Sequence, residues 1–177
     1  AASDVYKRQV INGVEVTYGQ GHWNIFGLDP HAWIDFRIHH NDTLRYRKVV
    51  AKARKAGRLL VATPPYNLDF LYDVTPMDGI EVWNSAWSPA NERAVELWHT
   101  LLVGGNRKFA VASTDFHRGG NIASPHTVVR AEALSAEAVI DAIAAGRSYV
   151  ARDTSAEIGM QVRNSCLLYT SPSPRDS

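Results

Sequence analysis

Apolar residues recur along this chain with two different periods, and segments of the two kinds alternate. Short runs rich in β-branched residues predict strands, whereas longer segments with an apolar residue every three or four positions predict helices. The predicted strands are 10–18, 23–28, 59–63, 80–84, 108–112, 127–130 and 148–150. Helices are predicted at 42–57, 88–104 and 135–146, each opened by an N-cap residue and closed by a glycine. The alternation predicts an α/β fold with a largely parallel sheet, either open or closed into a barrel.

The first two predicted strands form an antiparallel hairpin around the turn residues 19–21. If the hairpin loop has an even number of residues, Glu15 and His22 lie on the same face of the sheet. If the loop has an odd number of residues, they lie on opposite faces. Glu15 stands between Val14 and Val16, and a buried carboxylate in such a strand needs a partner, of which a metal ion is one. The alternative is a solvated Glu15 and a His22 in a polar turn.

A second pair of possible metal ligands follows the apolar run 108–112. Side chains two apart on extended chain share a face, so Asp115 and His117 can point together into a cleft at the carboxyl end of this strand, where α/β folds carry their functional groups. Carboxylate and imidazole are the ligands that borderline divalent metals take. The alternative without a metal is that Asp115 caps a helix and that His117 is half-buried. The presence of two such pairs favours a metal site.

Length and composition exclude several classes of protein. With 177 residues, 45% of them hydrophobic, the chain is long enough for one domain with a real core. No apolar run approaches the ~20 residues that cross a bilayer. The formal net charge is +1 without a basic stripe, so nucleic acid is not an implied partner. A small-molecule substrate is the expected partner, while the compartment and the oligomeric state stay open.

Both ends of the chain resemble translated sequencing adapter. Residues 4–9 can be encoded by a short DNA element whose reverse complement, read one base out of frame, encodes the segment 166–170. This element looks like the transposase adapter used to prepare sequencing libraries. We therefore expect residues 1–9 and 165–177 to be non-native and residues 10–164 to be the C-terminal portion of the natural domain. The single cysteine, Cys166, falls in the excluded end and does not report on a redox compartment.

Four motifs in this order, at 13–17, 21–24, 81–84 and 113–117, resemble the PHP (polymerase and histidinol phosphatase) superfamily. Together with the closing segment 142–147 they are most similar to its branch of CehA/McbA-like metal-dependent hydrolases. The resemblance spans nearly all of residues 10–155. It implies a distorted, seven-stranded TIM-like (β/α) barrel that holds two or three divalent ions (Mn, Zn or Fe) at the C-terminal ends of its strands.

Carried over position by position, the resemblance implies a role for five residues. Glu15 is the bridging carboxylate ligand, and His22 is a second metal ligand. Asp115 and His117 are metal ligands and the catalytic residues. Asn84 lies near the substrate.

The sequence departs from the family pattern in two places. The family's opening strands carry His-x-His, and nothing before Val10 supplies it, so the barrel is expected to be partial and to lack its N-terminal strands. The fragment itself is therefore expected to be impaired as an enzyme. Thr63 stands where the family has a metal-binding histidine, and a hydroxyl is a poor substitute for imidazole. Thr63 therefore marks a diverged ligand position.

The function implied is that of a metal-dependent hydrolase that uses metal-activated water, and a phosphoester is the favoured substrate. A carbamate or amide hydrolase on the same scaffold stays open. The rival from a different class is a degenerate, non-catalytic PHP-like module that binds a partner or one structural metal, and Thr63 is the feature that favours it. An amidohydrolase-like barrel would expect a lysine or histidine at a strand end, and no lysine stands at such a place.

Overall fold

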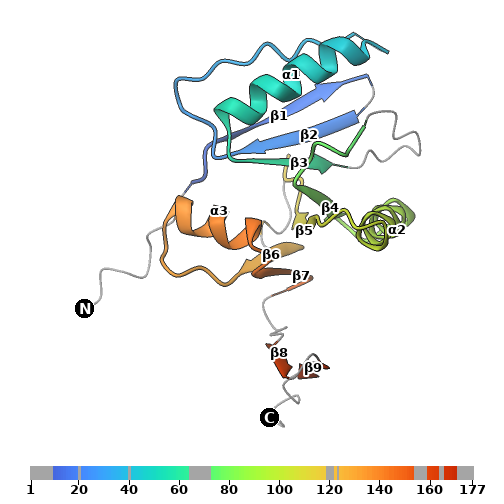
Figure 1. Ribbon diagram of the computed structural model, residues 1–177, viewed down its shortest axis with the longest axis vertical. Coiled ribbons are helices and arrows are strands. Elements are labelled where there is room, and N and C mark those ends of the chain that lie inside the picture. The colour runs from blue at the N-terminus through green and yellow to red at the C-terminus, as the bar shows by residue number, and fades with distance from the viewer. Residues whose placement is uncertain are drawn as a thin grey trace.

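A computed structural model describes residues 10–19, 21–39, 41–63, 73–118, 122, 124–153, 159–163 and 166–170, the last two ranges by their backbone alone. The ends 1–9 and 171–177, which the sequence predicts to be adapter-derived, lie outside the described residues. The described elements alternate between strands and helices, as the sequence predicts (Figure 1).

The centre of the fold is a five-stranded sheet with the order β1-β2-β3-β4-β5. Its strands are β1 (Gly13–Tyr18), β2 (Gly21–Phe26), β3 (Leu59–Thr63), β4 (Gly79–Asn84) and β5 (Phe109–Ser113). The pairs β1–β2 and β2–β3 are antiparallel, whereas β3–β4 and β4–β5 are parallel. Tyr18 pairs with Gly21 at the end of the hairpin, so its connection holds an even number of residues. Glu15 and His22 therefore share a face, as the even alternative predicts.

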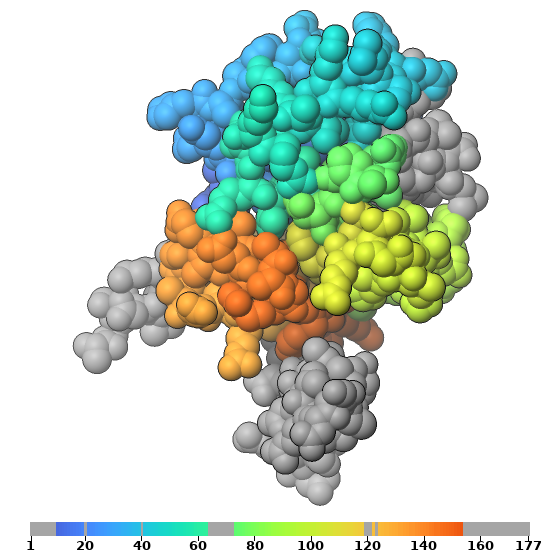
Figure 2. All heavy atoms as spheres, viewed as in Figure 1, coloured from blue at the N-terminus to red at the C-terminus, as the bar shows by residue number. Residues whose placement is uncertain are grey.

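The helices are α1 (Thr43–Ala56), α2 (Pro89–Val103) and α3 (Ala136–Ala144). Figure 1 shows α1 lying along β1–β3, α2 beside β4, and α3 next to β6. The predicted N-caps of α1 and α3 are confirmed, because the side chains of Asp42 and Ser135 accept hydrogen bonds from the first turns of these helices. Ser88 occupies the N-cap position of α2 without a side-chain hydrogen bond, and α3 ends at a C-cap of Ala145 instead of the predicted Gly146. In the space-filling view, the atoms of α1 and of the segment before it form the upper part of the molecule (Figure 2).

One face of the sheet is buried against α1. The sheet contributes buried apolar side chains from four strands, namely Val16, Trp23, Ile25, Leu60, Ala62, Ile80 and Val82. The facing side of α1 contributes Tyr46, Val49, Val50 and Ala53. Within the described residues this is one continuous core, and it fixes which face of the sheet is left for function.

A second, two-stranded antiparallel sheet stands beside β5. It consists of β6 (His126–Val129) and β7 (Ser148–Ala151). The Thr127 hydroxyl donates to the Ala112 carbonyl at 3.1 Å and accepts from the Ala112 amide at 2.9 Å, so it joins the two sheets. A separate antiparallel pair, β8 (Gly159–Arg163) and β9 (Cys166–Thr170), is described by its backbone. The adapter origin of residues 165–177 stays a prediction.

The α/β class predicted from the sequence is confirmed, with three parallel strands, β3 to β5, forming one side of a mixed sheet. The described strands form an open five-stranded sheet beside a two-stranded one, and closure into a barrel stays a prediction. No helix in the described ranges is both long and apolar enough to span a bilayer.

The contact between Gly79 and Phe109 generates a test of the β4–β5 packing. These residues are partners across the two strands, and a methyl group at position 79 would overlap the Phe109 ring. We expect Gly79→Ala to lower the free energy of unfolding by about 1–3 kcal/mol, measured by urea denaturation. In a Phe109→Ala background the same substitution should cost less, because the ring is gone. Equal cost in both backgrounds would contradict the packing described.

The helix caps give a matched pair of variants. Asp42 accepts from the Arg45 amide at 2.8 Å, whereas the Ser88 side chain makes no cap hydrogen bond to α2. Asp42→Ala should therefore cost about 1 kcal/mol of stability in urea denaturation. Ser88→Ala should cost almost nothing, and a loss as large as that of Asp42→Ala would show that the two caps are equivalent.

Candidate functional site

The face of the sheet opposite α1 carries polar side chains and lines a cavity of about 630 Å³. Residues from all five strands contribute to it: Glu15, Thr17, His22, Asn24, Thr63, Glu81 and Ser113. Side chains alternate between the two faces of the sheet along each strand, which separates the polar face from the apolar one. Glu15 pairs with Asn24 on the cavity side, whereas the next pair, Val16 and Trp23, is buried in the core. The aromatic side chain of Trp23 thus belongs to the core and not to the cleft.

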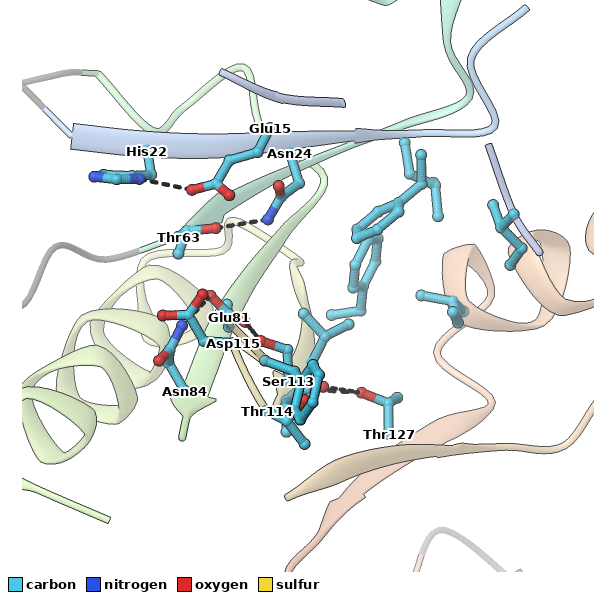
Figure 3. A pocket seen from close by; sticks show the side chains of 18 of the residues that line it. Glu15, His22, Asn24, Thr63, Glu81, Asn84, Ser113, Thr114, Asp115 and Thr127 are labelled. Atoms are coloured by element: carbon cyan, nitrogen blue, oxygen red, sulfur yellow. Dashed lines mark hydrogen bonds and ion pairs between the residues drawn. The ribbon is translucent and has the colours of Figure 1, made fainter. Parts of the chain in front are cut away.

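The cavity has a polar and an apolar end. The labelled polar side chains in Figure 3 gather on one side, and apolar side chains fill the other. The apolar lining comes from the start of the chain, the strand ends near α3, and α3 itself: Ile11, Phe26, Leu59, Phe109, Ile140 and Ile143. A ligand in this cavity would therefore meet charged groups at one end and a surface that excludes water at the other.

Glu15 and His22 are hydrogen-bonded to each other across the β1–β2 hairpin (Figure 3). The His22 Nδ1 atom lies 2.6 Å from Glu15 Oε1, and Thr17 Oγ1 lies 3.3 Å from the same nitrogen. An ionised carboxylate can only accept, so His22 Nδ1 carries the proton and the ring's lone pair is on Nε2. This is the arrangement in which a carboxylate orients a histidine that ligates through its other nitrogen.

Asp115 and His117 form a second pair just beyond β5. The His117 Nδ1–H donates to the backbone carbonyl of Asp115 at 2.8 Å, and the same nitrogen lies 3.5 Å from Asp115 Oδ1. The carbonyl can only accept, so the lone pair of this ring is again on Nε2. The His117 side chain is 79% exposed and that of Asp115 is 31% exposed, so both are open to a ligand entering the cavity.

A buried carboxylate, Glu81, lies in the floor of the polar end. Glu81 is 4% exposed, and its oxygens accept hydrogen bonds from the Ser113 hydroxyl and, at 3.4 Å, from the Asn84 amide. The Thr63 hydroxyl also hydrogen-bonds to Glu81, and it accepts from Asn24 Nδ2 at 2.8 Å. Burial raises the pKa of the Glu81 carboxyl above its usual value, and these hydrogen bonds oppose the effect only in part.

An irregularity in β4 brings Asn84 to this carboxylate. Residues three apart on a regular strand face opposite sides, so Glu81 and Asn84 would be separated. The register with β5 shifts between Glu81 and Trp83, which returns Asn84 to the cavity side and opposite Ser113. The bulge therefore places the predicted substrate-contacting residue in the polar end.

The ionisable side chains that line the cavity are mostly acidic. Among its lining residues in the described part of the chain are the three carboxylates of Glu15, Glu81 and Asp115, the two imidazoles of His22 and His117, and no lysine or arginine. Such a lining attracts cations and repels anions, and the apolar walls strengthen the field. An anionic substrate could bind here only if its charge were offset by a bound cation.

The four predicted metal ligands all line this one cavity, as two pairs. Their carboxylate and imidazole groups suit Mn, Zn or Fe in chemical type. However, among the described residues no three or more histidines, cysteines, aspartates or glutamates stand close enough together to hold a metal ion. Each pair supplies two donors, fewer than the three protein ligands that catalytic zinc usually takes. A joint metal centre of these four residues stays a prediction.

The site contains residues that the sequence did not single out as functional. Glu81, Asn24 and Ser113 have no predicted role, although all three line the polar end. A signal for Glu81 was present, since a carboxylate between Ile80 and Val82 is as anomalous in a buried strand as Glu15 is in the first one. Asn24 and Ser113 carry no such signal, because uncharged polar side chains cost less than a carboxylate in a strand.

No protein-family model matches this chain, and no curated protein matches its sequence. Among solved structures, the chain is similar to a crystal structure of a two-domain protein from Bacteroides vulgatus ATCC 8482 that contains a predicted PHP-like metal-dependent phosphoesterase. The two structures superpose with a TM-score of 0.56 at 18% sequence identity, over 87% of this chain and 52% of that chain. This chain therefore spans about half the length of that protein. At such low identity the likeness concerns the fold alone, and the chain shares its fold with part of that protein.

Proposed function

We propose that the cavity is the active site of a metal-dependent hydrolase, and that its substrate is a phosphoester. The observation that carries the proposal is the lining of the polar end, with three carboxylates, two imidazoles and no basic side chain among the described residues. Carboxylates with no basic side chain beside them among the described lining residues favour a bound cation. The shared fold with a predicted PHP-like metal-dependent phosphoesterase supports the same reaction class.

In this proposal the polar end holds divalent ions of Mn, Zn or Fe, with His22 and His117 ligating through Nε2 and Glu15 and Asp115 ligating through carboxylate oxygens. When bound, such ions lower the pKa of water towards neutrality and neutralise charge on the attacked oxygen. The carbonyl of Asp115 keeps the His117 ring in the tautomer that ligates through Nε2. Asn84, at the mouth of β4, offers an amide to a substrate oxygen.

The finer assignment to a partial, distorted (β/α) barrel of the CehA/McbA-like branch belongs to the same proposal. Three parallel strands, β3 to β5, carry polar groups at one end and have α1 and α2 on their outer side. Barrel enzymes place their helices and functional groups in this way.

A non-catalytic, PHP-like module is the second candidate. Two observations favour it: the described residues gather no three metal-ligating side chains, and the Thr63 hydroxyl is engaged by Asn24 and Glu81. A module of this kind would bind a metal ion or a partner without turning over a substrate.

Activity distinguishes the two candidates. With Mn²⁺ or Zn²⁺ supplied, the chain should hydrolyse p-nitrophenyl phosphate, and Asp115→Asn should lower kcat/KM by at least about a hundredfold, because a lost ligand costs no less than a lost orienting partner. Asp141→Asn is the matched control, since Asp141 pairs with Arg58 outside the cavity. Equal losses in both variants would count against the site. Turnover of a p-nitrophenyl carbamate alone would reassign the substrate class.

Metal binding can be measured without turnover. A Zn²⁺ concentration a hundred times the dissociation constant should stabilise the chain by about 2.7 kcal/mol in thermal denaturation, and a chelator should reverse the gain. His22→Gln should reduce the gain, whereas His99→Gln, on the exposed side of α2, should leave it unchanged. Stabilisation without hydrolysis would favour the non-catalytic module, and an absence of stabilisation would refute both metal-binding candidates.

A further inference from the structure

Two residues that are not glycine adopt left-handed backbone conformations at neighbouring strand ends. Ser85 follows β4 directly with a φ of 53°, and Asp115 lies two residues beyond β5 with a φ of 47°. Such conformations cost energy for residues with a Cβ atom, and they persist where the surrounding structure imposes them. Asp115 is one of the proposed catalytic residues, so the contacts that impose its conformation matter to the site.

Ser85 is bound to the chain immediately before Asp115 by two hydrogen bonds. Its amide donates to the Ser113 carbonyl at 3.0 Å, and its hydroxyl donates to the Thr114 carbonyl at 2.9 Å. The Thr114 carbonyl and the Asp115 amide belong to one planar peptide unit. The φ angle of Asp115 is the rotation about the bond between its own nitrogen and Cα. By binding the Thr114 carbonyl, the Ser85 hydroxyl therefore fixes the orientation of the peptide plane that precedes the Asp115 Cα.

The turn that carries Ser85 is itself braced from α2. The side chain of Asn91, a residue that is 5% exposed, accepts a hydrogen bond from the Asn84 backbone amide at 3.0 Å and donates one to the Ala86 carbonyl at 3.0 Å. The Trp83 indole donates to the Ser85 carbonyl at 3.0 Å. Side chains thus fix the peptide units around Ser85, and the residue cannot relax without breaking partly buried hydrogen bonds.

We infer that Ser85 is a positioning residue. Asn91 fixes the turn that contains Ser85, and the Ser85 hydroxyl sets the peptide plane that presents Asp115 and His117 to the cavity. The inference rests on the proposed function, because that function gives Asp115 and His117 their role. Ser85 itself does not line the cavity. It acts through the Thr114 carbonyl, and its effect on a ligand is indirect.

The first test needs no metal. Backbone ¹³C chemical shifts of Asp115 in the metal-free chain report its φ angle, and they are compared in wild type, Ser85→Ala, Ser85→Gly and Ser88→Ala. Ser88 is the matched control, since it lies in the same β4–α2 connection and its buried hydroxyl makes no hydrogen bond among the described residues. Glycine tolerates the positive φ but lacks the hydroxyl, so it separates the backbone strain from the hydrogen bond.

We expect the Asp115 shifts to move away from their left-handed values in both Ser85 variants and to stay unchanged in Ser88→Ala. The loss of one hydrogen bond should shift the population of the loop by about fivefold. Asp115 shifts in Ser85→Gly that match those of wild type would overturn the inference, because the backbone preference alone would then suffice.

The second test adds Zn²⁺ alone to the same four proteins in a calorimetric titration. The dissociation constant should rise about fivefold in both Ser85 variants and stay at the wild-type value in Ser88→Ala. Unchanged affinity in the Ser85 variants would overturn the inference while leaving the proposed function intact. If wild type binds no Zn²⁺, the proposed function fails, and the chemical shifts alone decide whether Ser85 positions Asp115.

Discussion

The alternation of side chains across the five-stranded sheet is the constraint on which both the core and the cavity depend. Neighbouring residues on a strand point to opposite faces, so Glu15 faces the cavity while Val16 faces α1. A slip of one residue in the hairpin would bring a carboxylate into the packing against α1 and the Trp23 indole into the cavity. The burial of Val16 and Trp23 as paired residues therefore selects the register that places Glu15 beside His22. Packing energy on one face positions the charges on the other.

These charges are costly, and their arrangement gives the cavity its character. Glu81 is buried at the centre of the polar end with hydrogen-bond donors but no basic side chain among the described residues that line the cavity, and Glu15 and Asp115 add to the same field. A protein that needed only stability would fill this face with apolar side chains, since buried charge costs more than buried hydrocarbon. A field of one sign in a cavity that also has an apolar end is the feature on which the proposed cation site rests. The strained conformations of Ser85 and Asp115 stand at this same end.

Much of the fold could be predicted from the sequence, because its local signals agree with one another. Periodicity and caps predict the three helices within a few residues. For the hairpin, the sequence predicts that Glu15 and His22 share a face if the loop has an even number of residues, and the loop does. The bulge that turns Asn84 towards Glu81 could not be predicted, since it depends on the register with β5 and leaves no local signature. The left-handed conformation of Asp115 is equally a product of tertiary hydrogen bonds. Whether two ligand pairs join into one centre depends on distances between strands, which no spacing along the chain encodes.

The central claim is that the two ligand pairs bind metal within one cavity. It is tested most directly by a crystal structure of the Zn²⁺-soaked chain, with anomalous diffraction data collected at the zinc absorption edge. The account predicts anomalous peaks inside the cavity at about 2.0–2.2 Å from the Nε2 atoms of His22 and His117 and from carboxylate oxygens of Glu15 and Asp115. Peaks only at exposed histidines elsewhere, such as His99, or an empty cavity at saturating Zn²⁺, would contradict it.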